Sequence, residues 1–151
     1  GLKLHDANHF PYDDTAYEPA YELAHDKASP VLLHTWGDPD EFAAAVGVAK
    51  SYPNLTIILA HGGSSNPDGY IETALAAPNI VIDTCFSRCP PGLVEYLVRG
   101  AGADKIVFGS DAYFYSLTQQ LGKIMAADVD DEIKKRILND NAAEILSRVR
   151  H

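Results

Sequence analysis

The chain has 151 residues, of which 46% are hydrophobic and 22% are charged, and its formal net charge is −9. These values are typical of a soluble globular protein, and the length suits a single domain, residues 1–151, with a core of its own. The negative charge argues against nucleic acid as a partner, because no stripe of lysine and arginine is present to neutralise phosphates. No apolar run approaches the ~20 residues of a membrane span, so no membrane partner is expected.

The predicted elements alternate between short apolar strands and helices. Strands are predicted at residues 2–4, 31–34, 55–60, 79–84 and 105–108. Helices are predicted between them at residues 16–27, 39–51, 68–76 and 93–99. In the clearest helix start, Asp38 can cap the helix, Pro39 suits its first position and Glu41 lies three residues after the cap.

From the second strand onward, the strands recur at a nearly constant spacing. They start near residues 31, 55, 80 and 105, which are 24, 25 and 25 residues apart. Each step matches one strand–loop–helix–loop unit, and the strands are apolar without alternation, as in a parallel sheet covered on both faces. We therefore predict an α/β fold with about five parallel strands. Two or three C-terminal helices are predicted at residues 116–127, 130–138 and 141–149.

Three of the predicted strands are followed closely by side chains that can bind a metal or transfer a proton. The second strand ends at His34, the third at His61, and Asp111 follows the fifth after Gly109 and Ser110. The carboxyl ends of parallel strands are where α/β enzymes place their active sites, so these side chains are expected to converge. Two imidazoles and a carboxylate suit a divalent metal or acid–base catalysis. The alternatives are that the histidines are structural and that Asp111 caps the helix after it.

Other residues near the strand ends are candidates for binding a small-molecule substrate. Trp36 and Tyr113 can line an apolar pocket, Arg88 can hold a substrate carboxylate, and His5 closes the first strand as His34 and His61 close theirs. The alternatives are loop packing for the aromatic residues and a solvated charge for Arg88. The remaining histidines, expected at the surface, are His9, His25 and His151.

The two cysteines, Cys85 and Cys89, leave two interpretations open. They lie close enough in sequence to form a local disulfide, but reduced thiols of a cytoplasmic protein are the preferred interpretation. Zinc bound by cysteines alone is excluded, because the chain has no other cysteine.

Five stretches, taken in order, resemble the amidohydrolase-related (amidohydrolase 2) family of metal-dependent hydrolases and decarboxylases. They are Gly1-Leu2-Lys3-Leu4-His5, Pro30-Val31-Leu32-Leu33-His34-Thr35, Ala60-His61-Gly62-Gly63, Phe108-Gly109-Ser110-Asp111 and Asn141-Ala142-Ala143-Glu144-Ile145-Leu146. The resemblance spans essentially the whole chain. It implies an incomplete (β/α)8 TIM barrel, in which the five strands resemble strands four to eight of the family.

The resemblance also implies roles for the strand-end residues. His34 corresponds to a metal ligand, and His61 to a residue that polarises the substrate or acts as an acid and is a ligand in members with two metals. Asp111 corresponds to a ligand that also acts as the base for the nucleophilic water. The implied cofactor is a divalent metal, zinc by expectation. The implied reaction is hydrolysis of an amide, lactone or ester-like bond, with decarboxylation of a small carboxylic acid as the alternative.

The sequence departs from the family pattern at the first strand, because the His-x-His metal ligands are absent and His5 and His9 have the wrong spacing to replace them. The chain starts at Gly1 without a methionine and is expected to be a fragment or a processed product. A third interpretation is therefore a non-catalytic fragment. Five strands cannot close a barrel of eight. Inner-face residues, expected to include Leu33, Ile58, Ile82 and Val107, would then be covered by a homo-oligomer, by the missing N-terminal barrel segment or by a C-terminal helix.

Overall fold

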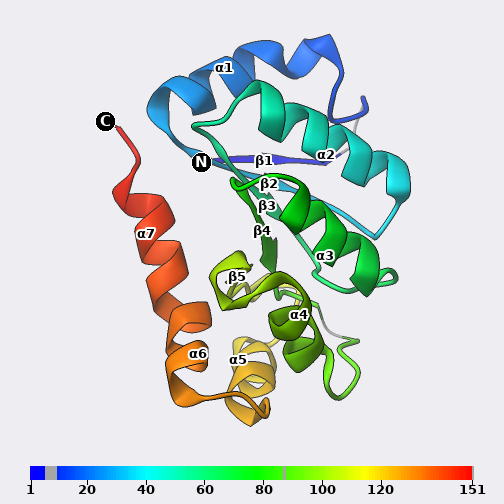
Figure 1. The fold of residues 1–151 in the computed structure, drawn as a ribbon, viewed down its shortest axis with the longest axis vertical. Helices are drawn as coiled ribbons and strands as arrows, with labels where there is room; N and C mark the ends of the chain where they lie inside the picture. The colour runs from blue at the N-terminus through cyan, green and yellow to red at the C-terminus, as the bar shows by residue number, and fades with distance from the viewer. Residues whose placement is uncertain (6–9, 87, 151) are drawn as a thin grey trace.

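The computed structural model describes residues 1–5, 10–86 and 88–150. The surface positions predicted for His9 and His151 lie outside these residues. Within them, the chain forms one parallel sheet with helices on both of its faces (Figure 1).

The five predicted strands are confirmed and pair in chain order, β1-β2-β3-β4-β5. Their bounds are Leu2–Leu4 for β1, Pro30–Leu33 for β2, Thr56–Leu59 for β3, Ile80–Asp83 for β4 and Ile106–Val107 for β5. All four pairings are parallel. Most strands are shorter than predicted, and β5 has only two residues. His34, His61 and Asp111 therefore lie just beyond the carboxyl ends of β2, β3 and β5.

The helices also follow the prediction closely. Their bounds are Glu18–Lys27 for α1, Pro39–Ser51 for α2, Pro67–Ala76 for α3, Leu93–Ala101 for α4, Leu117–Ala126 for α5, Asp131–Lys135 for α6 and Asn141–Ser147 for α7. A π-helical turn, Arg136–Asp140, joins α6 to α7 without a break. The predicted cap of α2 is present, since the Asp38 carboxylate accepts a hydrogen bond from the Asp40 N–H at 2.8 Å. In the described ranges, no helix has the length and apolar character to cross a membrane.

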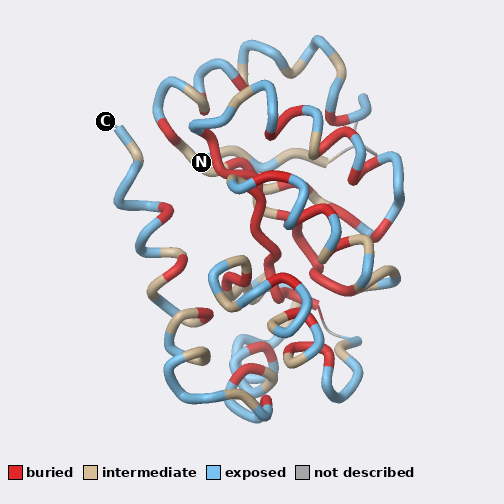
Figure 2. Tube along the Cα trace, in the orientation of Figure 1, coloured by how far each residue is buried: buried red, intermediate tan, exposed pale blue. Residues whose placement is uncertain are grey.

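Helices α1 to α4 cover one face of the sheet and form the main core with it (Figures 1 and 2). Leu33, Leu59 and Ile82 are in register on neighbouring strands, so their side chains share this face, and each is fully buried. Leu33 and Ile82 were expected on the opposite, open face, and that expectation is wrong. An unbroken apolar run hides the alternation of side chains, so only the strand register assigns each residue to a face.

The opposite face of the sheet is partly covered by α7. Ile145 packs there against Val81, Val107 and Ile58, in a small cluster separate from the main core. Figure 1 shows α7 on the side of the sheet away from α2 and α3. The end of the chain is anchored near α1, because the Arg150 N–H donates to the Lys27 carbonyl at 2.8 Å. Of the possible covers expected from the sequence for this face, a C-terminal helix is therefore the one that covers part of it.

Candidate active site

The two strand-end histidines are in direct contact. His61 Nε2 lies 3.2 Å from His34 Nδ1, and the ring centroids are 4.5 Å apart at an interplanar angle of 74°. Each residue is brought there by a strand, β2 or β3, that is paired with its neighbour along its whole length. The predicted convergence of the two imidazoles is therefore present in the fold.

The imidazole of His61 is held in one orientation. Its Nδ1 lies 2.7 Å from the carbonyl oxygen of Cys85. A carbonyl can only accept, so Nδ1 carries the proton, and a neutral His61 therefore presents the lone pair of Nε2 toward His34. The side chain is 2% exposed and its backbone has a φ of 60°, in the left-handed region. Such strain in a residue other than glycine is typical of functional positions.

Trp36 and His5 flank the histidine pair. The indole of Trp36 stacks on the His61 ring with centroids 4.7 Å apart, and the His5 ring stacks on His34 with centroids 3.9 Å apart. Glu41 fixes the backbone of Trp36, because its carboxylate accepts the Trp36 N–H at 3.0 Å. Glu41, which the sequence predicted in the first turn of α2, therefore also positions Trp36 beside the two histidines.

Asp83 and Cys85 form a buried polar pair that the sequence analysis missed. The Cys85 N–H donates to Asp83 Oδ1 at 2.7 Å, and the Cys85 thiol donates to Oδ2 at 2.9 Å. Burial raises the pKa of the Asp83 carboxyl, while these hydrogen bonds lower it in part. Burial and the Asp83 charge raise the pKa of the Cys85 thiol. Asp83 is the last residue of β4 and follows an apolar run, as His34 follows the apolar run of β2, so the rule that singled out His34 could have found it.

Asp111 follows β5 at the same end of the sheet. It lines a groove of about 360 Å³ together with Asp83, Cys85 and apolar residues of the sheet and α7. Its backbone φ is 47°, again in the left-handed region. The alternative that Asp111 caps the next helix is wrong, because Ser116 caps α5. The Asp111 carbonyl instead closes a turn by accepting the N–H groups of Phe114 and Tyr115.

Two predicted substrate-binding residues lie at the surface. Arg88 is exposed, and the side chain of Tyr113 is fully exposed to solvent. Neither is brought against the imidazoles by a ring contact or hydrogen bond among the described residues. The two cysteines are not bonded to each other, as expected of reduced thiols.

A divalent metal fits the histidine pair only in part. Two nitrogens about 2.0 Å from one tetrahedral ion lie roughly 3.3 Å apart, and the facing nitrogens of His34 and His61 are 3.2 Å apart. Donation of the second ring N–H to a backbone carbonyl, as in His61, is the usual support of a metal-binding histidine. However, the described residues contain no group of three or more His, Cys, Asp or Glu side chains that could hold an ion. The chain therefore provides two donors of a site that normally needs at least three.

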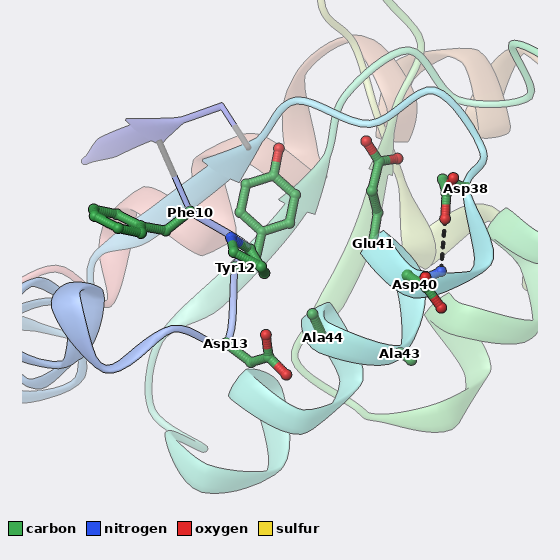
Figure 3. Close-up of a pocket in the computed structure, with 9 residues that line it drawn as sticks. Phe10, Tyr12, Asp13, Asp38, Asp40, Glu41, Ala43 and Ala44 are labelled. Atoms are coloured by element: carbon green, nitrogen blue, oxygen red, sulfur yellow. Dashed lines mark hydrogen bonds between the residues drawn. The ribbon is translucent and has the colours of Figure 1, made fainter. Parts of the chain in front are cut away.

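A further cavity lies outside this centre. It has a volume of about 600 Å³ between residues 10–13 and the start of α2, and its polar lining is mainly acidic (Figure 3). No histidine of the described ranges lines it. Tyr12 separates the two regions, because it lines the cavity while its hydroxyl donates to the His34 carbonyl. The cavity is therefore a neighbour of the histidine pair and shares one wall with it.

Five parallel strands paired in chain order, with helices between them, form a partial α/β barrel of the TIM type, as the TIM-barrel structures that match it show. The sequence matches the amidohydrolase family model over residues 1–148, and the chain belongs to that family. The predicted family and fold class are both confirmed. No curated protein matches the chain closely enough to count as a relative.

Solved structures share this fold. A TIM-barrel protein from Bordetella bronchiseptica has a TM-score of 0.75 and 22% identity, over 92% of this chain and 53% of its own. A dihydroxybenzoic acid decarboxylase from Polaromonas, with bound manganese and the inhibitor 2-nitroresorcinol, has a TM-score of 0.71 and 18% identity, over 94% of this chain and 57% of its own. A protein from Pseudomonas putida, named as a candidate 2-pyrone-4,6-dicarboxylic acid hydrolase, has a TM-score of 0.76 and 17% identity, over 100% of this chain and 64% of its own. The chain therefore spans between half and two thirds of the length of these proteins.

Proposed function

We propose that this chain carries the active-site half of a metal-dependent hydrolase that acts on an amide, lactone or ester-like bond of a small molecule. The observation that carries the proposal is the His34–His61 contact at 3.2 Å, with His61 locked by Cys85 so that Nε2 faces its partner. The proposed cofactor is a divalent metal, with zinc as the first candidate. Manganese in the Polaromonas neighbour supports a divalent ion without selecting zinc.

Each residue has a definite task in this proposal. When bound, a divalent ion would lower the pKa of a coordinated water to ~7 and so supply hydroxide. His34 would contribute an imidazole nitrogen to hold the ion. His61 would either contribute Nε2 as a second ligand or, with a proton on Nε2, donate to the scissile carbonyl and polarise it, because one nitrogen cannot do both. Asp111, at the same edge of the sheet, would take the proton of the water. Trp36 shields the buried face of His61 from solvent.

The outer residues complete the proposed binding site. His5 backs the His34 ring by stacking on it. Arg88 and Tyr113 lie in exposed segments near the strand ends and would contact the substrate, Arg88 through a carboxylate group. Because the described residues supply too few metal donors, the remaining donors would come from a second copy of the chain or from an N-terminal barrel segment. We place the protein in the cytoplasm, on the basis of its unbonded cysteines.

Decarboxylation of a small carboxylic acid is the second candidate function. It is favoured by the Polaromonas decarboxylase among the structural neighbours, just as hydrolysis is favoured by the Pseudomonas protein. A non-catalytic role is the third, and the incomplete donor set supports it.

Two substrates separate these functions. Purified chain loaded with zinc or manganese would be given 2-pyrone-4,6-dicarboxylic acid, followed by the absorbance of the ring, and a dihydroxybenzoic acid, followed by carbon dioxide release. Metal-dependent ring opening that is lost in His61→Ala and kept in His25→Ala would support hydrolysis. Carbon dioxide release with the same variant pattern would establish the second candidate. A metal-loaded chain that turns over neither compound would favour the non-catalytic role.

A further inference from the structure

The short segment after β4 holds His61 through its backbone. The Cys85 carbonyl accepts the His61 Nδ1–H at 2.7 Å. The orientation of the imidazole therefore depends on where this carbonyl points. The flanking backbone is also bonded, since the Thr84 N–H donates to the Val107 carbonyl at 3.1 Å.

The two carbonyls on either side of Cys85 share one cation. The Lys123 ammonium donates to the Thr84 carbonyl and to the Phe86 carbonyl, each at 2.6 Å. The carbonyls of residues 84 and 86 thus accept from the lysine, while the carbonyl between them accepts from the histidine. The Phe86 N–H also donates to the Thr84 carbonyl at 2.8 Å, which closes a three-residue γ-turn with Cys85 at its centre. Lys123 therefore holds the carbonyls at both ends of this turn, and so constrains the backbone that carries the Cys85 carbonyl.

The surroundings of Lys123 suit a structural cation. Its side chain is half-buried on α5, and burial lowers the pKa of its ammonium. Among the described residues it takes part in no ion pair with a carboxylate. Hydrogen bonds from a charged donor to carbonyls are stronger than neutral ones, so Lys123 is a firm attachment of α5 to the segment at residues 84–86.

The geometry points to Lys123 as a positioning residue that holds the Cys85 carbonyl in place to receive the Nδ1–H of His61. It keeps His61 in the tautomer that presents Nε2 to His34. The importance of this tautomer for turnover rests on the proposed function, whereas the tautomer itself is a property of the folded chain.

Lys105 provides a matched control. Its ammonium also donates to backbone carbonyls, those of Ala77, Pro78 and Ile80 at 3.0, 2.9 and 3.1 Å. It too is half-buried, with a pKa lowered by burial. Those carbonyls precede or begin β4, at the end of the sheet opposite to His61. Lys105→Met therefore removes an equivalent set of hydrogen bonds without touching the segment at residues 84–86.

Nuclear magnetic resonance of the ¹⁵N-labelled chain tests the inference without any activity assay. Two-bond ¹H–¹⁵N spectra, assigned with His61→Gln, report which ring nitrogen of His61 carries the proton and how fast that proton exchanges. In Lys123→Met we expect a mixture of tautomers, or Nδ1–H exchange faster by about tenfold or more, the scale of a lost hydrogen bond to a charged group. Lys123→Arg keeps two donors on a cation and should restore the wild-type signals. Lys105→Met should lose stability and yet leave the His61 signals unchanged.

A folded Lys123→Met variant with the wild-type His61 tautomer and exchange rate would overturn the inference. The same conclusion would follow if Lys105→Met changed the His61 signals as much as Lys123→Met does. If Lys123→Met does not fold, Lys123→Gln decides in its place, because its amide can reach at most one carbonyl well: faster exchange supports the inference and unchanged exchange overturns it. Failure of the wild-type chain to turn over substrate would count against the proposed function alone, since the tautomer is measured independently.

Discussion

The indole ring of Trp36 lies parallel to the imidazole of His61, with centroids 4.7 Å apart and planes 10° apart. Trp36 is the single tryptophan of the chain. Its fluorescence therefore reports directly on the state of the histidine pair. We expect zinc or manganese to change this emission in the isolated chain, with weak affinity because the described residues provide two imidazole donors rather than three or more.

Variants decide whether this signal comes from the site. His34→Ala should abolish the fluorescence change, and His25→Ala, on α1 and away from the site, should keep it. Calorimetry on the same proteins gives the affinity. Tight binding that persists in both His34→Ala and Asp111→Ala would contradict the assignment of these residues as ligands.

Metal binding should also move the proton that lies between the two histidines. Without an ion, the 3.2 Å contact between His34 Nδ1 and His61 Nε2 is a hydrogen bond and needs a proton on one of the two nitrogens. Because His61 carries its proton on Nδ1, the shared proton belongs to His34 Nδ1 when both rings are neutral. An ion shared by both nitrogens needs both lone pairs, so this proton should move to Nε2 of His34. Two-bond ¹H–¹⁵N spectra should therefore show this change of tautomer when zinc is added, and a His34 tautomer that stays the same at saturating zinc would show that the ion binds elsewhere.

The hydroxyl of Tyr70 stabilises the backbone next to the site, and its removal should be costly. It lies 2.9 Å from the Thr35 carbonyl and 2.9 Å from the Ala60 carbonyl, the residues that follow His34 and precede His61. Tyr70→Phe leaves a buried carbonyl short of a donor, which should reduce the free energy of unfolding by about 1–3 kcal/mol. Chemical denaturation measures the loss, with the fully exposed Tyr113→Phe as the control.

The ionisation of Tyr70 should make the stability of the protein depend on pH. Burial raises the pKa of Tyr70 from 10.0 to about 12. A pKa that is higher in the folded state gives stability that is fully present below pH 10 and is lost as the pH rises toward 12. The stability of Tyr70→Phe should therefore fall less than that of the wild type across this interval. Parallel curves for the two proteins would rule out this contribution.

Two glycines should respond in opposite ways to alanine. A Cβ on Gly109 would come within 1.9 Å of Asp83 Oδ1, the atom that accepts the Cys85 N–H, so Gly109→Ala should displace the carboxylate and cost about 1–3 kcal/mol. A Cβ on Gly122, within α5, would meet no atom within 4 Å, so Gly122→Ala should add about 0.5–1 kcal/mol. Thermal unfolding compares the two. A neutral Gly109→Ala would mean that Asp83 moves aside freely.

The sheet face opposite α1 to α4 predicts self-association. Ile145 of α7 covers Val81 and Val107, but Leu32 on the same face stays half-buried. In the part of the chain that the structure describes, no strand pairs with the outer edge of β1. Removing apolar surface from water is favourable by about 25 cal/mol per Å² of buried area. We therefore expect this face to be covered in a dimer or larger assembly. Light scattering coupled to gel filtration tests this. A monodisperse monomer at every dilution would show that α7 is a sufficient cover.

The order and type of the elements could be predicted from the sequence, because they depend on local properties. The repeat of apolar runs at 24 or 25 residues predicts parallel strands with intervening helices, and Asp38 and Pro39 predict the start of α2 at the residue where the structure has it. The strand-end positions of His34 and His61 also follow from the sequence, since each directly follows an apolar run. Their contact follows in turn from the parallel pairing of β2 with β3.

Other features depended on the tertiary structure, because they join residues that no local pattern connects. The strand register, rather than the apolar runs, placed Leu33 and Ile82 on the face covered by helices and Ile58 and Val107 on the other. The tautomer of His61 is decided by a carbonyl 24 residues away. The segment that holds this carbonyl is tied down by Lys123, which is 37 residues from Phe86. Hydrogen bonds of this kind form only when folding brings distant backbone and side chains together, so the sequence determined which residues stand at the site, and the fold determined how they are oriented.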